Sequence, residues 1–208
     1  MPTLIYHLTH IDNLASISQS GGCLSFNQKQ NQGIDHVDVA YKTVQVRRAQ
    51  TSVPCGSGGY LHDYVPFFFA PRPPMLYAIY RGYVEGYEQG QAPLIHLVTT
   101  VQAVNNSGSE WVFTDGHATM AFSDFFDDLK DLNEIDWKVM ESQYWNDTPT
   151  LPDRKRKRQA EFLIKDICSW ELFSEIGVIN SRMESRVKRM LENSMHQPTV
   201  QIHRDWYY

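Results

Sequence analysis

The chain has 208 residues and a formal net charge of -5 at pH 7, with 42% hydrophobic and 21% charged residues. That balance is typical of one globular domain with a substantial core, and its acidity argues against indiscriminate binding of duplex nucleic acid through the whole surface. We expect neither a transmembrane span nor a secretory signal, and the three widely spaced cysteines form no disulfide framework. We therefore expect a single domain over residues 1–208, in a reducing cytoplasm.

The N-terminal part is expected to begin with a strand and a short helix. Residues 4–9 combine aromatic and β-branched side chains, and alternation places His7 and Thr9 on one face of the strand. Asp12 is the expected cap of the helix that follows. Residues 25–50 are polar and show little periodicity, so we expect an ordered excursion over a binding cleft rather than a linker.

Further along the chain, strands and helices are mixed without a regular βαβ repeat. Strands are expected at residues 65–69, 94–99, 111–114, 177–179 and 199–203, helices at 73–82, 121–132, 137–144 and 182–193, and either type at 162–167. This mixture predicts an α+β fold rather than a doubly wound parallel sheet.

Two common kinds of catalytic site are not expected. The eight histidines are scattered without metal-ligand spacing, and neither His-Glu-x-x-His nor Cys-x-x-Cys occurs, so no catalytic metal is predicted. A serine nucleophile would need a strand and a helix around a sharp turn, and the Gly-rich segment 56–59 lacks both flanks. Hydrolase chemistry of that type is therefore disfavoured.

A basic run in this acidic chain is the strongest local signal. Five consecutive cations, from Arg154 to Arg158, lead to Glu161, a lone carboxylate that opens an apolar segment. Adjacent cations repel one another unless an anion is bound, so the run predicts contact with a polyanion. A solvated basic surface is the alternative, and the residues alone leave both open. The acidic stretch 124–136 is expected to be solvated surface.

The carboxylate after the run is the candidate catalytic group. Gln159 and Glu161 are two residues apart, so both side chains project to one face of an extended segment. A carboxylate in such a place could stabilise the oxocarbenium-like sugar that forms when a glycosidic bond breaks. The alternative is an ordinary surface Gln-x-Glu, which the spacing alone favours.

Six ordered segments carry a resemblance that covers nearly the whole chain. They are residues 5–14 (IYHLTHIDNL), 58–67 (GGYLHDYVPF), 74–80 (PMLYAIY), 112–117 (VFTDGH), 158–163 (RQAEFL) and 205–208 (DWYY). In these segments the sequence resembles the DarT family of bacterial DNA ADP-ribosyltransferase toxins. Several long matches in the same order make a specific signal, unlike a single short motif. Residues 27–38 have no counterpart in this resemblance.

The resemblance implies a fold, a reaction and a partner. The implied fold is the ADP-ribosyltransferase fold, with split sheets around an NAD cleft and peripheral helices. The implied toxin activity is transfer of ADP-ribose from NAD, a co-substrate, to a thymine base in single-stranded DNA, with release of nicotinamide and no metal. A DarG-like macrodomain antitoxin is the implied partner. Transfer to RNA or protein, and single-strand binding without catalysis, are the alternatives.

The resemblance also assigns residues to the NAD site. It implies contacts with NAD from His7, Leu8, Thr9, Ser16 and Leu24. Arg48 matches the arginine placed at the NAD diphosphate and the acceptor base, and Glu161 matches the catalytic glutamate. A guanidinium hardly deprotonates, so we expect Arg48 to orient the base rather than to accept its proton. A surface salt bridge is the alternative for Arg48.

The acceptor strand has its own expected contacts. Thymine N3 is occupied in a base pair, so the acceptor must be unpaired, and single strands are held by cationic grooves and aromatic platforms. The segment from about residue 117 to 161 matches the loop that presents the DNA. The expected DNA contacts are His117, Met75, Tyr144, Arg154, Arg156 and Arg158, with Trp145 as a further platform and Phe68 in the pocket wall. Core packing is the alternative for Tyr144.

Overall fold

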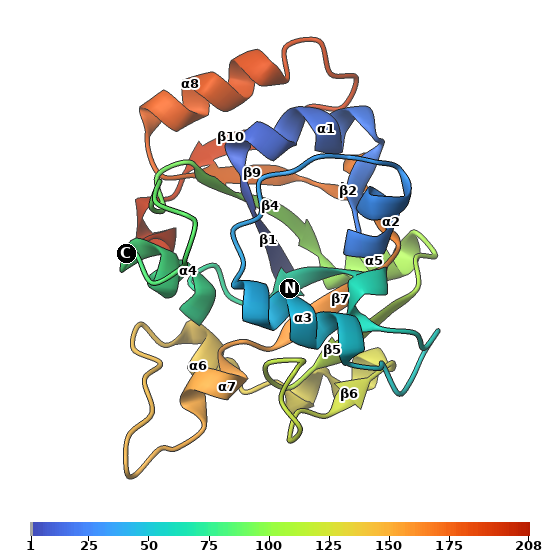
Figure 1. Cartoon of the computed structure of the whole chain (residues 1–208), viewed down its shortest axis with the longest axis vertical. Helices are drawn as coiled ribbons and strands as arrows, with labels where there is room; N and C mark the ends of the chain where they lie inside the picture. The colour runs from blue at the N-terminus through green and yellow to red at the C-terminus, as the bar shows by residue number, and fades with distance from the viewer. Residues whose placement is uncertain (1) are drawn as a thin grey trace.

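The structure, a computed structural model, describes residues 2–208, which form two sheets surrounded by short helices (Figure 1). The strands are β1 (Leu4–His10), β2 (Gly22–Leu24), β3 (Tyr64–Phe68), β4 (Leu94–Thr100), β5 (Trp111–Thr114), β6 (Phe125–Phe126), β7 (Glu161–Lys165), β8 (Ile167–Ser169), β9 (Glu175–Val178) and β10 (Thr199–Ile202). The helices are α1 (Leu14–Gln19), α2 (Phe26–Asn31), α3 (Lys42–Gln50), α4 (Pro74–Tyr80), α5 (Val101–Asn106), α6 (Trp137–Glu141), α7 (Arg154–Lys157) and α8 (Ser181–Met190). Short 3-10 helices cover Ile11–Asn13, Leu61–Asp63, Leu129–Glu134, Trp170–Leu172 and Arg204–Trp206.

The large sheet has eight strands in the order β10-β9-β4-β1-β3-β7-β5-β6, and β2 pairs with β8 in a second sheet. Neighbouring strands of the large sheet are antiparallel, except that β9 and β10 run parallel. Strand β3 lies between β1 and β7, and its register places Phe68 opposite both Tyr6 and Glu161. This order brings the N-terminal strand and the strand that starts at Glu161 to one region of the sheet.

The core explains why the central strands read as apolar runs. Six of the seven residues of β4 are buried, because both faces of this strand are covered. The largest fully buried side chains come from strands, from helices and from the segments between them: Ile5, Ile11, Leu14, Leu61, Tyr64, Phe67, Leu76, Ile79, Leu94, Phe113, Phe162 and Phe173. Burial of such side chains supplies most of the favourable free energy of folding.

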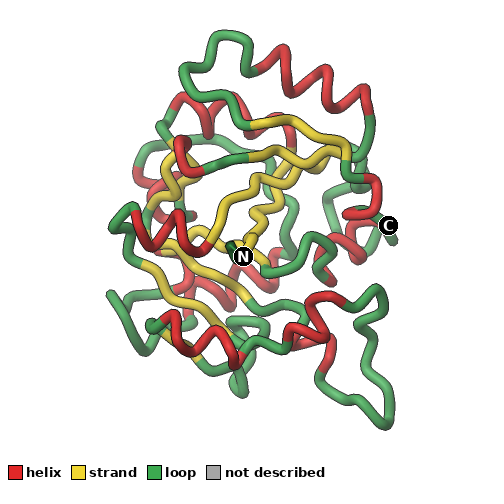
Figure 2. The backbone as a smooth tube through the Cα atoms, turned by 180° about the vertical axis from the view of Figure 1, so that it is seen from behind, coloured by secondary structure: helices red, strands yellow, loops and turns green. Residues whose placement is uncertain are grey.

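The termini and the peripheral helices lie in distinct places. Helix α8 and helix α1 lie at one end of the molecule, and α6 and α7 lie at the opposite end, as both views show (Figures 1 and 2). The C-terminal residue packs beside α4, where the Tyr208 ring is 5.0 Å from the ring of Tyr77. No helix among residues 2–208 combines the length and apolarity that crossing a membrane would require.

The expected α+β class is confirmed, and the expected strands are found at nearly the expected positions. The predicted helix 121–132 is wrong. Its Phe125 and Phe126 form strand β6, which pairs with β5, and the Phe126 ring stacks on Phe113 at 5.1 Å. Phe122, expected on the apolar side of that helix, is 74% exposed. Pairing with a sheet edge has overridden a helical pattern here.

Two other local predictions need correction. Asp12 does not cap the first helix: the His10 ring accepts a hydrogen bond from the Asp12 backbone N–H at 3.1 Å, and Asn13 is the residue at the start of α1. The predicted helix 137–144 ends at Glu141, so Tyr144 lies beyond it. The basic run, for which no helix was predicted, forms α7.

Candidate active site

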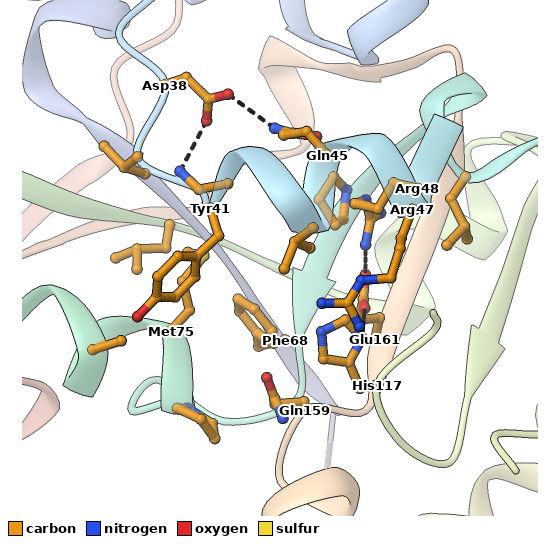
Figure 3. Close-up of a pocket in the computed structure, with 18 of the residues that line it drawn as sticks. Asp38, Tyr41, Gln45, Arg47, Arg48, Phe68, Met75, His117, Gln159 and Glu161 are labelled. Carbon is orange, nitrogen blue, oxygen red and sulfur yellow. Dashed lines mark hydrogen bonds and ion pairs between the residues drawn. The ribbon is translucent and has the colours of Figure 1, made fainter. Parts of the chain in front are cut away.

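A cavity of about 730 Å³ lies over the face of the large sheet where β1, β3 and β7 meet. Its floor includes His7 and Thr9 from β1, Phe68 from β3 and Glu161 from β7. Residues 36–48, from the predicted polar excursion, line the opposite wall, and α4 contributes Met75 (Figure 3). Part of the segment 25–50 thus lies over a cavity, as predicted.

Glu161 and Arg48 form a buried ion pair inside this cavity. Arg48 lies in the last turn of α3, and its Nη1 donates to Glu161 Oε2 at 2.7 Å. The two side chains are 10% and 4% exposed, so the pair is largely withdrawn from water. The Ala118 backbone N–H donates to Glu161 Oε1 at 3.2 Å. A carboxylate held by two donors in this way is fixed in position inside the cavity.

One donor of this pair has no partner. Arg48 Nη2 is buried and makes no hydrogen bond to any residue of 2–208. A buried polar group without a partner costs free energy, and such groups in native proteins call for an explanation. Arg48 lines the cavity, and a guanidinium in such a place can bind an anionic or carbonyl oxygen of a ligand through a second nitrogen. The alternative of a surface salt bridge does not fit a side chain this buried.

His117 lies beside the pair and is neutral. Its Nδ1 is 4.0 Å from Glu161 Oε1 and accepts a hydrogen bond from the Thr119 backbone N–H at 3.2 Å. Burial lowers the pKa of His117, although Glu161 opposes this effect. With Nδ1 accepting, the proton of the neutral ring is on Nε2. His117 therefore presents a hydrogen-bond donor, not a free base, at its second nitrogen.

His7 is a fixed part of the cavity floor. Its Nδ1 lies 2.8 Å from the Pro66 carbonyl oxygen, which can only accept, so this nitrogen carries the proton. Its Nε2 is 3.2 Å from Cys23 Sγ, whose S–H is then the donor. Burial lowers the pKa of His7 to about 4 and raises the pKa of Cys23 to about 12. Both groups are thus neutral near pH 7, and the ring is positioned rather than poised to titrate.

The structure brings most of the expected NAD contacts together. His7, Leu8, Thr9 and Leu24 all line the cavity. Ser16 does not: its hydroxyl donates to the Asn13 carbonyl oxygen at 2.9 Å, within the first turn of α1, so the predicted contact is not supported.

The predicted DNA contacts divide into two groups. His117, Met75, Phe68 and Trp145 line the cavity. Tyr144 lies outside the lining and is 73% exposed, so core packing is not its role and its ring is free to stack.

The arginines of the basic run are occupied by the protein itself. Arg156 pairs with Asp115 at 3.0 Å and with Asp153 at 2.8 Å. Arg154 donates to Ser142 Oγ at 2.8 Å and to the carbonyl oxygen of Tyr144. These side chains do not line the cavity, so the expectation of a free cationic groove is corrected for them.

Arg158 is the clearest correction. It is 4% exposed, and its Nη1 donates to the carbonyl oxygens of Val139 and Met140 at 2.6 Å and of Ser142 at 3.0 Å. Burial lowers its pKa to about 10, which still leaves it charged at pH 7. A guanidinium that satisfies the last carbonyls of α6 holds this loop in place and cannot reach a phosphate.

Among the lining residues that sequence reasoning did not single out, two matter for the argument below. Lys155 is the member of the basic run that lines the cavity, and it is exposed. Lys155 is the second residue of a short helix that the sequence did not predict, so the direction of its side chain could not be predicted either. Asn13 also lines the cavity, and it is 7% exposed. An asparagine next to the expected helix start was the available signal, since this residue type often bonds backbone groups.

Comparisons with known proteins match this chain to one family over nearly its whole length. The family model described as "ssDNA thymidine ADP-ribosyltransferase, DarT" matches residues 6–208. A DNA ADP-ribosyl transferase from Thermus sp. (strain 2.9) is 44% identical over 209 residues, which cover 100% of this chain and 97% of that protein. The solved structure of Thermus sp. 2.9 DarT in complex with ADP-ribosylated ssDNA is similar to this chain with a TM-score of 0.93, at 44% identity, covering 100% and 97% of the two chains.

Two further matches extend the comparison. The structure of Thermus sp. 2.9 DarT in complex with NAD+ gives a TM-score of 0.87 at 42% identity and covers 100% of this chain and 98% of that one. A DNA ADP-ribosyl transferase-DNA ADP-ribosyl glycohydrolase fusion protein from Thermosipho africanus is 25% identical over 191 residues. That match covers 91% of this chain and 46% of the fusion protein.

Proposed function

Because the chain belongs to the DarT family of ssDNA thymidine ADP-ribosyltransferases, we propose that Glu161 and Arg48 are its catalytic pair. The protein is an NAD-dependent DNA ADP-ribosyltransferase that acts on thymidine in single-stranded DNA. The observation that best supports these catalytic roles is the 2.7 Å ion pair between Arg48 and Glu161 on the floor of the cavity. We propose that residues 1–208 form a single ADP-ribosyltransferase domain.

Glu161 acts on the sugar. NAD loses nicotinamide when the bond between the ribose C1 and the pyridinium nitrogen breaks, and the bonding electrons neutralise the pyridinium. The ribose is left with oxocarbenium character, and a fixed carboxylate nearby lowers the energy of that positive charge. Glu161 is suited to this because Arg48 and the Ala118 N–H hold it in place. Thymine N3 then forms the new bond to C1, and its proton passes to water.

Arg48 and His117 act on the ligands as donors. The unpartnered Nη2 of Arg48 binds a diphosphate oxygen of NAD or a carbonyl oxygen of the thymine. A charged guanidinium has no lone pair to accept the N3 proton, so Arg48 orients the base. His117, with its proton on Nε2, supplies a second donor to the same region. These two donors favour a base that presents carbonyl oxygens on both sides of an N–H, as thymine does.

The side chains that line the cavity floor support the proposal that NAD binds there. His7, Leu8, Thr9 and Leu24 form an apolar surface with one hydroxyl, and His7 is locked by Pro66 and Cys23. We propose that NAD lies on this floor as co-substrate and that no metal takes part. Activity that persists unchanged after exhaustive treatment with EDTA would support this, and loss of activity restored by a divalent cation would contradict it.

The unpaired strand enters by the rim formed by residues 144–155. Lys155 supplies an exposed cation there, and Tyr144 supplies an exposed ring. Incubation with NAD and a panel of single-stranded oligonucleotides should add the mass of ADP-ribose to thymine-containing DNA. A thymine-free oligonucleotide and a duplex of the same sequence are the controls. Equal modification of either control, or of RNA in competition, would contradict the proposed acceptor.

We also propose a partner and a context. The Thermosipho fusion joins a transferase to a DNA ADP-ribosyl glycohydrolase, which supports a separate glycohydrolase of the macrodomain type as antitoxin for this chain. The protein would then be the toxin of a toxin–antitoxin pair in the cytoplasm. Expression of the chain alone should arrest growth, and co-expression of a DNA ADP-ribosyl glycohydrolase should relieve the arrest. Toxicity that persists although the DNA adduct is removed would argue against this partner.

A further inference from the structure

The segment of residues 34–41 covers part of the cavity and contains no helix or strand. Val39 anchors it by packing in an apolar cluster with Leu8 and Ile79. Polar contacts to the rest of the protein are few. Among residues 2–208, the hydrogen bonds of this segment join it to residues 29–45, with one exception, which is Asn13.

Asn13 binds this segment as one strand residue binds another. Its Oδ1 accepts from the Val37 backbone N–H at 2.8 Å, and its Nδ2 donates to the Val37 carbonyl oxygen at 3.0 Å. The second N–H of the same amide donates to Thr9 Oγ1 at 3.1 Å. Asn13 is 7% exposed, so these bonds are made away from bulk water. A single side chain therefore joins the cover of the cavity to the strand that forms its floor.

We propose that Asn13 is a positioning residue for NAD, a role that rests on the proposed function of this cavity. By holding Val37, it keeps residues 34–41 over the floor before the ligand arrives. By donating to Thr9 Oγ1, it leaves the hydroxyl proton of Thr9 directed to a ligand on the floor. Ordering this cover in advance lowers the entropic cost of NAD binding, since a cover that is already in place need not be immobilised by the ligand.

This role predicts a separation of kinetic constants. Asn13→Leu keeps a similar side-chain volume and removes all three hydrogen bonds. We expect KM for NAD to rise about ten- to thirtyfold at saturating oligonucleotide, because each such bond contributes roughly a factor of two to ten. We expect kcat to stay within about threefold, because Glu161 and Arg48 do not contact Asn13.

Hydrogen exchange gives a readout that does not depend on turnover. In the unmodified protein, the Val37 amide should exchange more slowly than other amides of residues 34–41, and NAD should slow the whole segment. In Asn13→Leu, the Val37 amide should exchange as fast as its neighbours. Rapid exchange of Val37 in the unmodified protein would overturn the proposal without any variant, so a variant that fails to fold does not leave it untested.

A matched control distinguishes loss of the hydrogen bonds between Asn13 and Val37 from a general loosening of residues 25–50. Asn27 lies at the start of the same excursion, and its Nδ2 donates to Asp63 Oδ1 at 2.7 Å, outside the cavity lining. Asn27→Leu should leave KM for NAD within about twofold. An equal rise in KM in both variants, or a fall in kcat at unchanged KM in Asn13→Leu, would overturn the proposal.

Failure of the proposed function would look different. The affinity for NAD can be measured by calorimetry with the Glu161→Gln protein, in which turnover is expected to be slow. There, adding Asn13→Leu should weaken NAD binding by the same factor as the rise in KM. If the unmodified chain transfers no ADP-ribose yet Asn13→Leu still weakens NAD binding, the assignment of Asn13 stands and the reaction is wrong. If transfer is normal and NAD binding is unchanged, the assignment of Asn13 is wrong.

Discussion

Replacing Arg158 by leucine distinguishes most sharply between a cation that builds the protein and a cation that binds DNA. Its guanidinium donates to three carbonyl oxygens at the end of α6 and, through Nε, to the Arg72 carbonyl oxygen at 3.2 Å. In Arg158→Leu, these acceptors lose a charged donor in a region where Arg158 is 4% exposed. At about 1 kcal/mol for each lost bond, partly offset by leucine packing, the variant should lose roughly 3 kcal/mol of unfolding free energy.

Urea unfolding measures this loss, and a thermal scan should show a fall in Tm of roughly 6–12 °C for a chain of this size. The salt dependence of oligonucleotide binding provides the contrast. Since Arg158 does not reach a phosphate, the slope of log K against log salt should be unchanged for the folded variant. Lys155→Leu is the matched control: its slope should fall by about 0.7, with stability changed by no more than about 0.5 kcal/mol. A stable Arg158→Leu protein with a reduced slope would refute the reasoning.

Three other predictions concern the pH response, the rim and the catalytic pair. Burial lowers the pKa of both His7 and His96 to about 4, so the unfolded chain binds more protons than the folded one between about pH 6.5 and 4. The free energy of unfolding, measured by urea titration, should therefore decrease as the pH is lowered from about 6.5 to 4. A flat profile would contradict the burial of both rings. Tyr144→Ala should weaken binding of single-stranded DNA by about 1–3 kcal/mol in fluorescence titrations while leaving Tm unchanged, because its ring is exposed. Arg48→Lys keeps the charge but loses the second nitrogen, so kcat/KM should fall by about tenfold or more, and unchanged kcat/KM would exclude a role for the forked geometry.

The strands and the outline of the site were predictable because their signals are local. Residues 4–9 and 94–99 show β-branched and apolar patterns that a sheet requires, and these patterns survive in β1 and β4. The residues around Glu161 made it a candidate, although the spacing alone favoured an ordinary surface glutamate, and the family resemblance singled it out. In contrast, residues 121–132 carry a helical pattern of phenylalanines, and only the edge of β5 explains why Phe125 and Phe126 form a strand.

The sequence shows which side chains are charged but not which groups they bind in the folded protein. Five adjacent cations predicted an anionic ligand, yet Arg156 is satisfied by Asp115, 41 positions away, and Arg158 by carbonyl groups of α6. The hydrogen bonds between Asn13 and Val37 span 24 positions, and the sequence around Asn13 does not identify Val37 as the partner. Such long-range pairs depend on the tertiary arrangement, which periodicity and spacing do not encode.

The rate of ADP-ribose transfer by Glu161→Gln under single-turnover conditions, with NAD binding measured in parallel, tests most directly whether this carboxylate carries the reaction. Glutamine keeps the size and the hydrogen-bond acceptor but removes the negative charge, so transfer to a thymine oligonucleotide should slow by a factor of about 10² or more, while NAD still binds. Glu88→Gln, at an exposed position, should transfer normally. Transfer by Glu161→Gln at the unmodified rate would contradict the account.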